Sequence, residues 1–592
     1  MSNWRRPGVS GVISWLVVSA LGAVEGMYGR NSYRGDWISY LNVSRAISAH
    51  DWKGTFDPMW NPGYPALVAL MRGAFPHTPE GEWYAITLLN WLIFLMAFGS
   101  WRYLIRQALE FYQPSLAGLR SHLTVVWPTT CAFLSGALCL NNASSVCPDL
   151  LVTALFLLAA AQLFSLLNRP GAIRAIGLGM TLGAGCWMKA VFFTFANIFL
   201  LVLLVANYSK KLSWRAWALS GLVYLAVFAP YVTCTSLIHG RHSVGGSGAL
   251  NYAFHVNHMP HWTNWQGGPA IFGTLLHPTR QLATDLPLFE FGAPFRTTYP
   301  PYNNMAYWYE GSRNFFSPKL QIIAIGRTFY FLGHIVREHP FLWALALSLF
   351  VVVMKRDWRT ALNPIARSFW PLFLPAILGI GTYLVVHIEE RYTAPFFLIF
   401  SLLPLLPLLE PALKLKRLLI AFLLVTFTAG AATELTLING RAWRAAIRRD
   451  DFHLDSQWKL SAALPRYGLK NGDAVAIVNT KMPAYLCHWA YVSNLRIVAE
   501  FGSLPWTLAP WDRTRFDHIG SEPADEDYGF VFWKKLAPER RVEVIEAFRR
   551  TGARAVLALS GEGAASEPGW QQISGTNAWI YRFTPSPAPA VH

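Results

Sequence analysis

The chain has 592 residues, of which 53% are hydrophobic and only 14% are charged, and its formal net charge is +17. A soluble chain usually carries about a quarter charged residues, so this composition excludes an ordinary cytosolic enzyme, a disordered chain and a disulfide scaffold. Residues 1–439 hold 31 basic and 17 acidic residues, a balance of +14, and the basic residues separate long hydrophobic runs. This arrangement predicts a polytopic membrane protein in contact with the lipid bilayer, and it argues against nucleic-acid binding.

Eleven hydrophobic runs are candidates for membrane-spanning helices, which need about 20 apolar residues or fewer inside a bundle. In chain order they are residues 11–28, 83–105, 123–140, 150–167, 173–188, 190–207, 216–238, 340–354, 367–387, 393–409 and 417–437. We place a tight turn near Lys189 because the stretch 173–207 is too long for one helix. With the N-terminus in the cytoplasm, the inner loops contain 17 basic and 3 acidic residues, as the positive-inside rule requires.

This topology places three large segments outside the cytoplasm, namely about 29–82, about 239–339 and everything after residue 438. The last segment has β-rich runs at 474–478 and 555–559 and a charged helical stretch at about 536–551, a pattern typical of an α/β domain. The predicted fold is therefore mainly α. A polytopic membrane helix bundle occupies residues 1–438, and a soluble extracytoplasmic α/β domain occupies residues 439–592.

The cysteines and histidines give no clear metal signature. None of the six cysteines forms a CxxC pair, and apolar packing is their default role. A Cys139–Cys147 disulfide is the one bridge left open, if both residues reach an oxidising compartment. His255, His258 and His261 follow one another at three-residue spacing and leave a divalent cation open as a cofactor, but Pro260 interrupts any helix that would align them.

The first outer segment carries a candidate general base. Asp36 lies a few residues beyond the first predicted span, and Tyr40 follows it on a predicted helix over residues 37–49. A carboxylate at this place can take a proton from an acceptor hydroxyl. The alternative is that Asp36 caps that helix.

Four motifs in the membrane part together resemble GT-C glycosyltransferases, which are polytopic enzymes that take sugars from polyprenyl-phosphate carriers. The similarity is to the branch that contains the protein O-mannosyltransferases and the bacterial aminoarabinose transferase. The motifs are the first outer loop with Asp36, Tyr40 and Asn61-Pro62-Gly63-Tyr64-Pro65, then Pro148-Asp149, then the Gly-rich run 183–190 ending in Lys189-Ala190, and finally Glu389-Glu390-Arg391-Tyr392-Thr393-Ala394-Pro395. The family usually has Pro-Pro where this chain has Pro62-Gly63.

The resemblance implies a role for each of these residues. Asp36 is expected to act as the base, and Lys189 and Arg391 to hold the phosphate of the donor, because cations near the interface stabilise charge on a departing phosphate. Membrane-buried ionisable groups are usually functional, although both side chains could instead reach the lipid headgroups. The further candidates for the substrate site are Tyr40, Tyr64, Asp149, Glu390 and Tyr392. Glu390 is expected to pair with a basic group.

The sequence thus predicts an inverting glycosyltransferase of a bacterial inner membrane. Its donor is a polyprenyl-phosphate sugar, with undecaprenyl phosphate as the expected carrier, and its extracytoplasmic acceptor is a glycan, lipid or protein of the cell envelope. A transporter or lipid flippase with an outer ligand-capturing domain is the alternative, and an assembly subunit with an inert membrane part is a third. A transporter should show charged residues in mid-membrane and internal repeats, whereas the ionisable residues here lie at the outer ends of spans.

Overall fold

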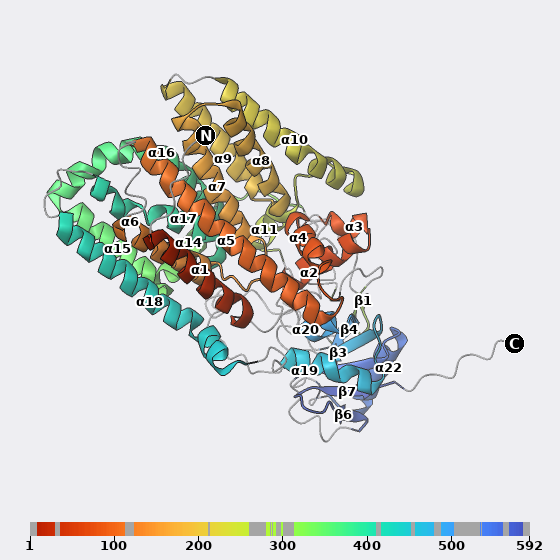
Figure 1. Cartoon of the computed structure of the whole chain (residues 1–592). Helices are drawn as coiled ribbons and strands as arrows, with labels where there is room; N and C mark the ends of the chain where they lie inside the picture. Colours follow the sequence, from red (N-terminus) through yellow and green to blue (C-terminus); the bar gives the residue numbers. More distant parts are fainter. Residues whose placement is uncertain are drawn as a thin grey trace. The chain divides into compact units, whose positions relative to one another are not determined.

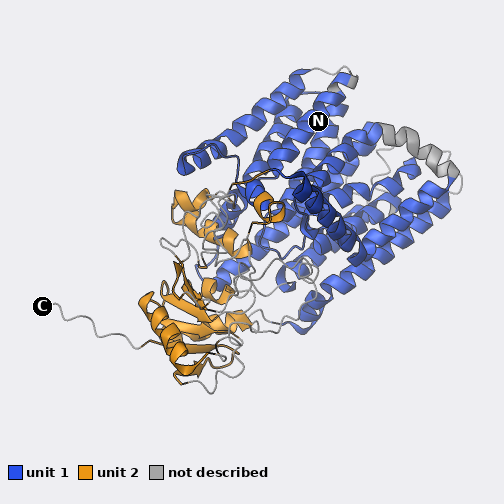
Figure 2. Ribbon diagram, turned by 180° about the vertical axis from the view of Figure 1, so that it is seen from behind, with its two compact units in different colours: residues 1–30, 60–251, 316–450 blue, residues 31–59, 252–315, 451–592 orange. Residues whose placement is uncertain are grey.

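The computed structural model describes residues 9–29, 36–57, 59–112, 123–210, 214–259, 280–283, 286, 288–291, 298–299, 313–409, 416–450, 456–478, 487–501, 533, 536–559 and 568–583. The chain divides into two compact units, each assembled from three separate stretches (Figure 2). Unit 1 comprises residues 1–30, 60–251 and 316–450. Unit 2 comprises residues 31–59, 252–315 and 451–592.

All regular structure described in unit 1 is helical (Figure 1). Its elements are α1 (Val9–Tyr28), α4 (Gly63–Arg72), α5 (Pro79–Tyr112), α6 (Leu123–Leu134), the π-helix η2 (Ser135–Leu140), α7 (Asp149–Asn168), α8 (Ala172–Met188), α9 (Phe192–Lys210), α10 (Trp214–His239), α14 (Pro318–Glu338), α15 (Pro340–Met354), α16 (Arg356–Leu384), α17 (Glu390–Phe400), the 3-10 helix η4 (Leu403–Leu409) and α18 (Lys416–Arg448). Helix α11 (Ser247–His255) lies where unit 1 passes into unit 2.

Several of these helices are long and apolar enough to cross a membrane. Among the described residues, length and composition identify six such helices, or seven if the bent pair α14–α15 is one span. Four shorter apolar helices of 10–17 residues accompany them. Each predicted span coincides with a helix, and the total of eleven remains a prediction. The predicted turn near Lys189 is confirmed, because α8 ends at Met188 and α9 begins at Phe192.

Glycines allow α8 to pack closely against α10. A methyl group added at Gly179 would lie 2.5 Å from the carbonyl oxygen of Ser220, and one added at Gly183 would lie 2.6 Å from the Cβ of Val227. Contacts this short are not tolerated, so only glycine permits this distance between the helices. The Gly-rich run therefore fixes the end of α8 that leads into Lys189.

The two cysteines that could have formed a disulfide are both free thiols. Cys139 lies in η2, where its sulfur is 3.4 Å from the side-chain oxygen of Asn439, and Cys147 is buried just before α7. The Cys139–Cys147 bridge considered from the sequence is therefore wrong. Both side chains instead pack as small buried groups, which is the usual role of a free cysteine.

Unit 2 is built around a mixed seven-stranded sheet with the order β1-β2-β4-β3-β5-β7-β6. The strands are β1 (Arg280–Gln281), β2 (Leu288–Glu290), β3 (Ala474–Val478), β4 (Arg496–Phe501), β5 (Ala555–Ala558), β6 (Trp570–Gln572) and β7 (Trp579–Arg582). The central strands β4, β3 and β5 are parallel, and the outer pairs are antiparallel. Helix α22 (Pro538–Arg550) contributes Val544 and Phe548 to the core beneath the sheet, where both are fully buried.

The described helices of unit 2 besides α22 are short. They are α2 (Asp36–Ser48), α3 (Trp52–Thr55), α19 (Ser456–Ala463), the 3-10 helix η6 (Leu464–Tyr467) and α20 (His488–Val492). Strands β3 and β5 and helix α22 occupy the positions that the sequence predicted.

The C-terminal residues do not form unit 2 alone. Strands β1 and β2, which precede β4 by about 200 residues, join the sheet through β4. The Tyr299 hydroxyl donates to the buried Glu500 carboxylate at 2.5 Å, and the Ile497 amide donates to the Thr298 carbonyl at 2.9 Å. Helix α18 also continues through residue 438 to Arg448. The boundaries therefore differ from 438/439, because strands of two and three residues leave no periodic signal in the sequence.

Candidate active site

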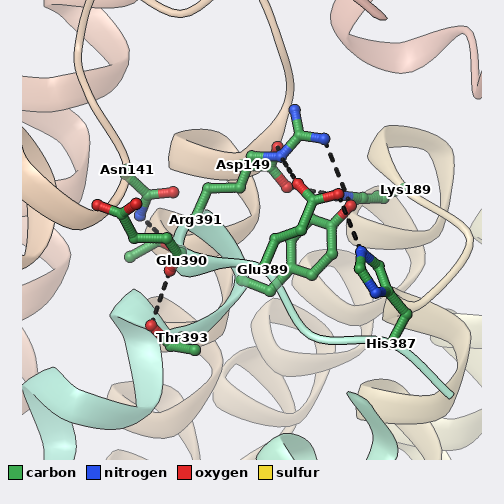
Figure 3. A network of polar contacts seen from close by, with 10 residues as sticks. Asn141, Asp149, Lys189, His387, Glu389, Glu390, Arg391 and Thr393 are labelled. Carbon is green, nitrogen blue, oxygen red and sulfur yellow. Dashed lines mark hydrogen bonds and ion pairs between the residues drawn. The ribbon is translucent and has the colours of Figure 1, made fainter. Parts of the chain in front are cut away.

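The site begins with an ion pair between two helix ends. Asp149 is the first residue of α7, and Lys189 follows the last residue of α8 in an extended conformation with φ −156° and ψ 136°. The Lys189 ammonium contacts Oδ1 of Asp149, and Nε of Arg391 lies 3.6 Å from Oδ2 of the same carboxylate (Figure 3). Asp149 is only 4% exposed, so both cations meet a buried carboxylate. The structure thus brings together three of the predicted site residues.

Tyr392 provides an aromatic face for the two cations. The Lys189 ammonium nitrogen lies 4.1 Å from the centre of the Tyr392 ring, and the guanidinium carbon of Arg391 lies 5.3 Å from it. The ring is stacked on Tyr383 from the end of α16, with 4.8 Å between the ring centres. Cations are attracted to an aromatic face, and stacking limits the movement of that face. Tyr392 therefore helps to hold both positive side chains in place.

Glu389 and His387 complete the surroundings of Arg391. Nε of Arg391 donates to Glu389 at 2.7 Å, and Nε2 of His387 lies 3.2 Å from the other oxygen of Glu389. Desolvation disfavours the charged carboxylate, but Arg391 and His387 hold the pKa of Glu389 well below its usual range. Glu389 is therefore an anion that orients the guanidinium.

The neighbouring Glu390 has a different partner. Its carboxylate lies 2.8 Å from Nε2 of His339, whose Nδ1 lies 2.6 Å from the buried carboxylate of Glu434 on α18. Figure 3 shows Glu390 pointing away from Lys189 and Asp149. The basic group that Glu390 contacts is thus His339, which stands between α14 and α15, and not the adjacent Arg391.

The Asn61–Pro65 motif packs against the end of α8. The Asn61 side-chain amide donates to the Cys186 carbonyl at 2.8 Å. A methyl group at Gly63 would lie 2.7 Å from the Trp187 carbonyl oxygen and 2.6 Å from the sulfur of Met188. Any side chain at position 63 would therefore collide with the residues just before Lys189.

Tyr64 connects the same motif to the loop before α7. Its buried hydroxyl donates to the side-chain oxygen of Asn90 at 2.9 Å, and the Asn90 amide donates to the Ser145 carbonyl at 2.9 Å. That loop leads directly to Pro148 and Asp149. Tyr64 therefore supports the position of Asp149 through α5. All four sequence motifs have residues in this region of unit 1, with the first represented by Asn61–Pro65.

The backbone adds positive potential to the same place. Helices α7, α9 and α17 begin at Asp149, Phe192 and Glu390, so three helix N-termini adjoin the cations Lys189 and Arg391. Each N-terminus carries a partial positive charge from the dipole of its helix. The arrangement can hold an anion and stabilise negative charge that develops on it.

Asp36 and Tyr40 belong to unit 2, where Asp36 is the first residue of α2 and Tyr40 is 5% exposed. The assignment of Asp36 as the base stays a prediction.

Of the three histidines considered for a metal, His261 lies outside the described residues. The part of the chain that the structure describes contains no group of three or more His, Cys, Asp or Glu side chains that could hold a metal ion.

Sequence reasoning missed three side chains next to the cations, Tyr383, His387 and Glu389. Glu389 lies inside the motif 389–395, two residues before Arg391, and this spacing was a signal that could have predicted their ion pair. Tyr383 and His387 lie before that motif, at and beyond the end of α16, and no spacing or composition marks them. Only the folded structure brings them to the site.

Comparison with solved structures shows what this fold is similar to. The structure of ArnT from Cupriavidus metallidurans bound to undecaprenyl phosphate matches with a TM-score of 0.52 and 12% identity over 96% of this chain and 97% of that one. The apo structure of the same protein gives 0.49 and 11% identity, with 96% of each chain covered. The archaeal oligosaccharyltransferase AglB from Archaeoglobus fulgidus, in complex with an inhibitory peptide and a dolichol-phosphate, gives 0.46 and 12% identity over 92% of this chain and 69% of that one.

No protein-family model and no curated protein sequence matches the chain. ArnT is an aminoarabinose transferase of the GT-C superfamily, so the structural match confirms the predicted resemblance at the level of the fold. The protein has a GT-C fold.

Proposed function

We propose that the protein is an inverting glycosyltransferase that moves a sugar from a polyprenyl phosphate to an acceptor outside the cytoplasm. The observation that carries the proposal is the convergence of Lys189 and Arg391 on the carboxylate of Asp149 where three helices begin. Two cations and three helix N-termini suit the phosphate of a lipid-linked donor. The structure of ArnT contains bound undecaprenyl phosphate, which supports this carrier for the proposed donor.

In the proposed reaction, Asp36 takes the proton of an acceptor hydroxyl. The hydroxyl oxygen attacks the anomeric carbon from the face opposite the phosphate, and the bond between that carbon and the phosphate oxygen breaks, so the configuration inverts. The electron pair of the broken bond stays on the phosphate, whose growing charge Lys189 and Arg391 stabilise. Asp149, Glu389 and Tyr392 keep the two cations in place for this task.

The setting proposed for this reaction is the outer side of a bacterial inner membrane. The chain would cross it several times, with a cytoplasmic N-terminus and an extracytoplasmic C-terminal segment, as the distribution of basic residues predicts. The acceptor would be a glycan, lipid or protein of the cell envelope.

A transporter or flippase is the alternative function, and such a protein would use buried acidic groups in its membrane helices to bind ions or substrate. Glu25 in α1 and Glu434 in α18 are 2% and 1% exposed. Both have polar partners, since Asn439 donates to Glu25 at 2.8 Å and the Phe341 amide donates to Glu434 at 3.0 Å. Such satisfied contacts are typical of structural groups, and the transferase is the better supported function.

The decisive experiment measures transfer from radiolabelled undecaprenyl-phosphate sugars to envelope acceptors by the purified protein in lipid vesicles. Lys189→Gln and Arg391→Gln should each weaken binding of undecaprenyl phosphate about 10- to 100-fold, because a charge-assisted hydrogen bond contributes about 1.5–3 kcal/mol. Arg174→Gln, which changes a basic residue near the start of α8, is the matched control and should bind normally. Movement of the lipid across the vesicle without transfer of its sugar would favour the flippase instead.

A further inference from the structure

Helix α2, which carries Asp36, is attached to the C-terminal part of unit 2 by Arg45. The Nη1 atom of Arg45 donates to the Tyr491 carbonyl at 3.2 Å and to the side-chain oxygen of Asn494 at 3.3 Å. The guanidinium carbon also lies 3.6 Å above the centre of the Tyr491 ring. One arginine thus makes two hydrogen bonds and a cation–π contact with residues more than 400 positions away in the sequence.

The surface that receives Arg45 is held rigidly. Tyr491 is fully buried in α20, and the Trp489 amide at the start of that helix donates to the Gln457 side chain of α19 at 3.3 Å. The Asn494 backbone has a positive φ of 50°, and its carbonyl accepts from the Gly472 amide at 2.8 Å. The turn then enters β4, a central strand of the sheet. The position of this turn is therefore set by the sheet.

The simplest alternative is that Arg45 only complements the dipole at the C-terminal end of α2, where it occupies the last turn. A residue with that role needs no partner from another part of the chain, whereas Arg45 has three contacts with the segment 491–494. In an α-helix, nine residues span about 13 Å and two and a half turns. Arg45 therefore anchors one face of α2 at its far end, and Asp36 begins the helix on the opposite face.

We infer that Arg45 is a positioning residue, through which the C-terminal part of unit 2 sets the place of Asp36. This inference rests on the proposed function, because it takes Asp36 as the base. It gives the C-terminal segment a definite role in transfer. Removing the anchor should lower turnover and leave the donor phosphate site of unit 1 intact, since Lys189 and Arg391 make none of these contacts.

The test uses the full-length protein in lipid nanodiscs with the variants Arg45→Ala and Arg45→Lys, and with Lys53→Ala as a matched control from the exposed surface of the neighbouring helix α3. In Arg45→Ala, amide hydrogen exchange of residues 36–48 should accelerate at least about 10-fold, and kcat should fall about 10-fold or more, while undecaprenyl-phosphate affinity changes less than about twofold. Arg45→Lys should recover part of the protection, because an ammonium keeps the attraction to the Tyr491 ring but loses the planar fork. The control should match wild type throughout.

Unchanged exchange of residues 36–48 in Arg45→Ala would overturn the inference, as would a loss of donor affinity as large as the loss of kcat. Asp36→Asn is measured alongside to separate this result from the proposed function. If that variant transfers sugar at the wild-type rate, the assignment of the base fails, while the exchange data still decide whether Arg45 anchors α2. If only the Arg45 variants behave like wild type, the inference alone fails.

Discussion

Lys189 and Asp149 form an ion pair between the residue that follows one helix and the first residue of another. A donor phosphate bound here would contact Lys189 and Arg391, which also contact the carboxylate of Asp149. Because like charges repel across a few ångströms, we expect Asp149→Asn to bind undecaprenyl phosphate several-fold more tightly and to turn over more slowly. Equilibrium binding and steady-state transfer measure the two effects. Glu110→Gln, which breaks an ion pair with Arg106, is the control, and weaker binding in Asp149→Asn would contradict the prediction.

The two cations should act as a unit on one phosphate. We expect the double variant Lys189→Gln/Arg391→Gln to lose less binding free energy than the sum of the two single losses, because groups that share a ligand are coupled. Arg391→Lys should recover only part of the affinity, since lysine lacks the planar fork of donors with which an arginine can bond Glu389 and a phosphate at the same time. Titration of the wild type and the four variants with undecaprenyl phosphate supplies the five affinities. Strictly additive losses would mean that the two residues serve different groups.

Asp36→Asn tests the proposed base. The amide keeps the size of the side chain but cannot accept the proton, so turnover should fall at least about 100-fold while donor affinity is retained. Asp51→Asn in the same unit is the matched control, because Asp51 caps α3 by accepting from the Gly54 amide at 3.2 Å and should affect stability alone. Near-normal transfer by Asp36→Asn would show that Asp36 is not the base.

His339 should matter more for stability than an exposed histidine nearby. It is 3% exposed and lies between Glu390 and the buried Glu434, so His339→Ala leaves a buried carboxylate without its charged partner. Breaking a buried pair in this way typically costs about 3–5 kcal/mol. His334→Ala removes a pair whose side chains are 36% and 57% exposed and should cost about 1 kcal/mol or less. Thermal unfolding in the same detergent compares them, and equal losses would refute the distinction.

Gly63 should tolerate no side chain. Gly63→Ala would place a methyl group 2.7 Å from the Trp187 carbonyl, so the end of α8 must shift and carry Lys189 with it. We expect a destabilisation of about 1–3 kcal/mol and weaker binding of undecaprenyl phosphate. In Gly221→Ala the added methyl meets nothing within 4 Å, which makes it the control. Normal donor binding by Gly63→Ala would show that this packing does not position Lys189.

The sequence predicted the position of a side chain where that position depends only on the end of one helix. The length of the apolar stretch 173–207 and the motif at 389–395 indicated where α8 ends and α17 begins, so both cations could be assigned to helix ends. The contact of both cations with Asp149 could not be predicted, because Asp149 and Tyr383, which stacks on Tyr392, come from helices whose packing depends on the whole bundle. The boundary of unit 2 was missed for the same reason. Hydropathy depends only on the residues of one segment. Strands β1 and β2 form because β2 pairs with the distant strand β4 and β1 pairs with β2.

The sheet of unit 2 also sets an order of events during biosynthesis. Strand β2 pairs with β4, which is synthesised about 200 residues later. During translation, β2 therefore exists before the strand that pairs with it. Until β4 emerges, the backbone groups of β2 are an unpaired edge, which is a site for wrong association or proteolysis. Premature termination before β4 would therefore expose that edge permanently. Membrane proteases and chaperones would then encounter an incomplete sheet even though every helix of unit 1 had already been synthesised.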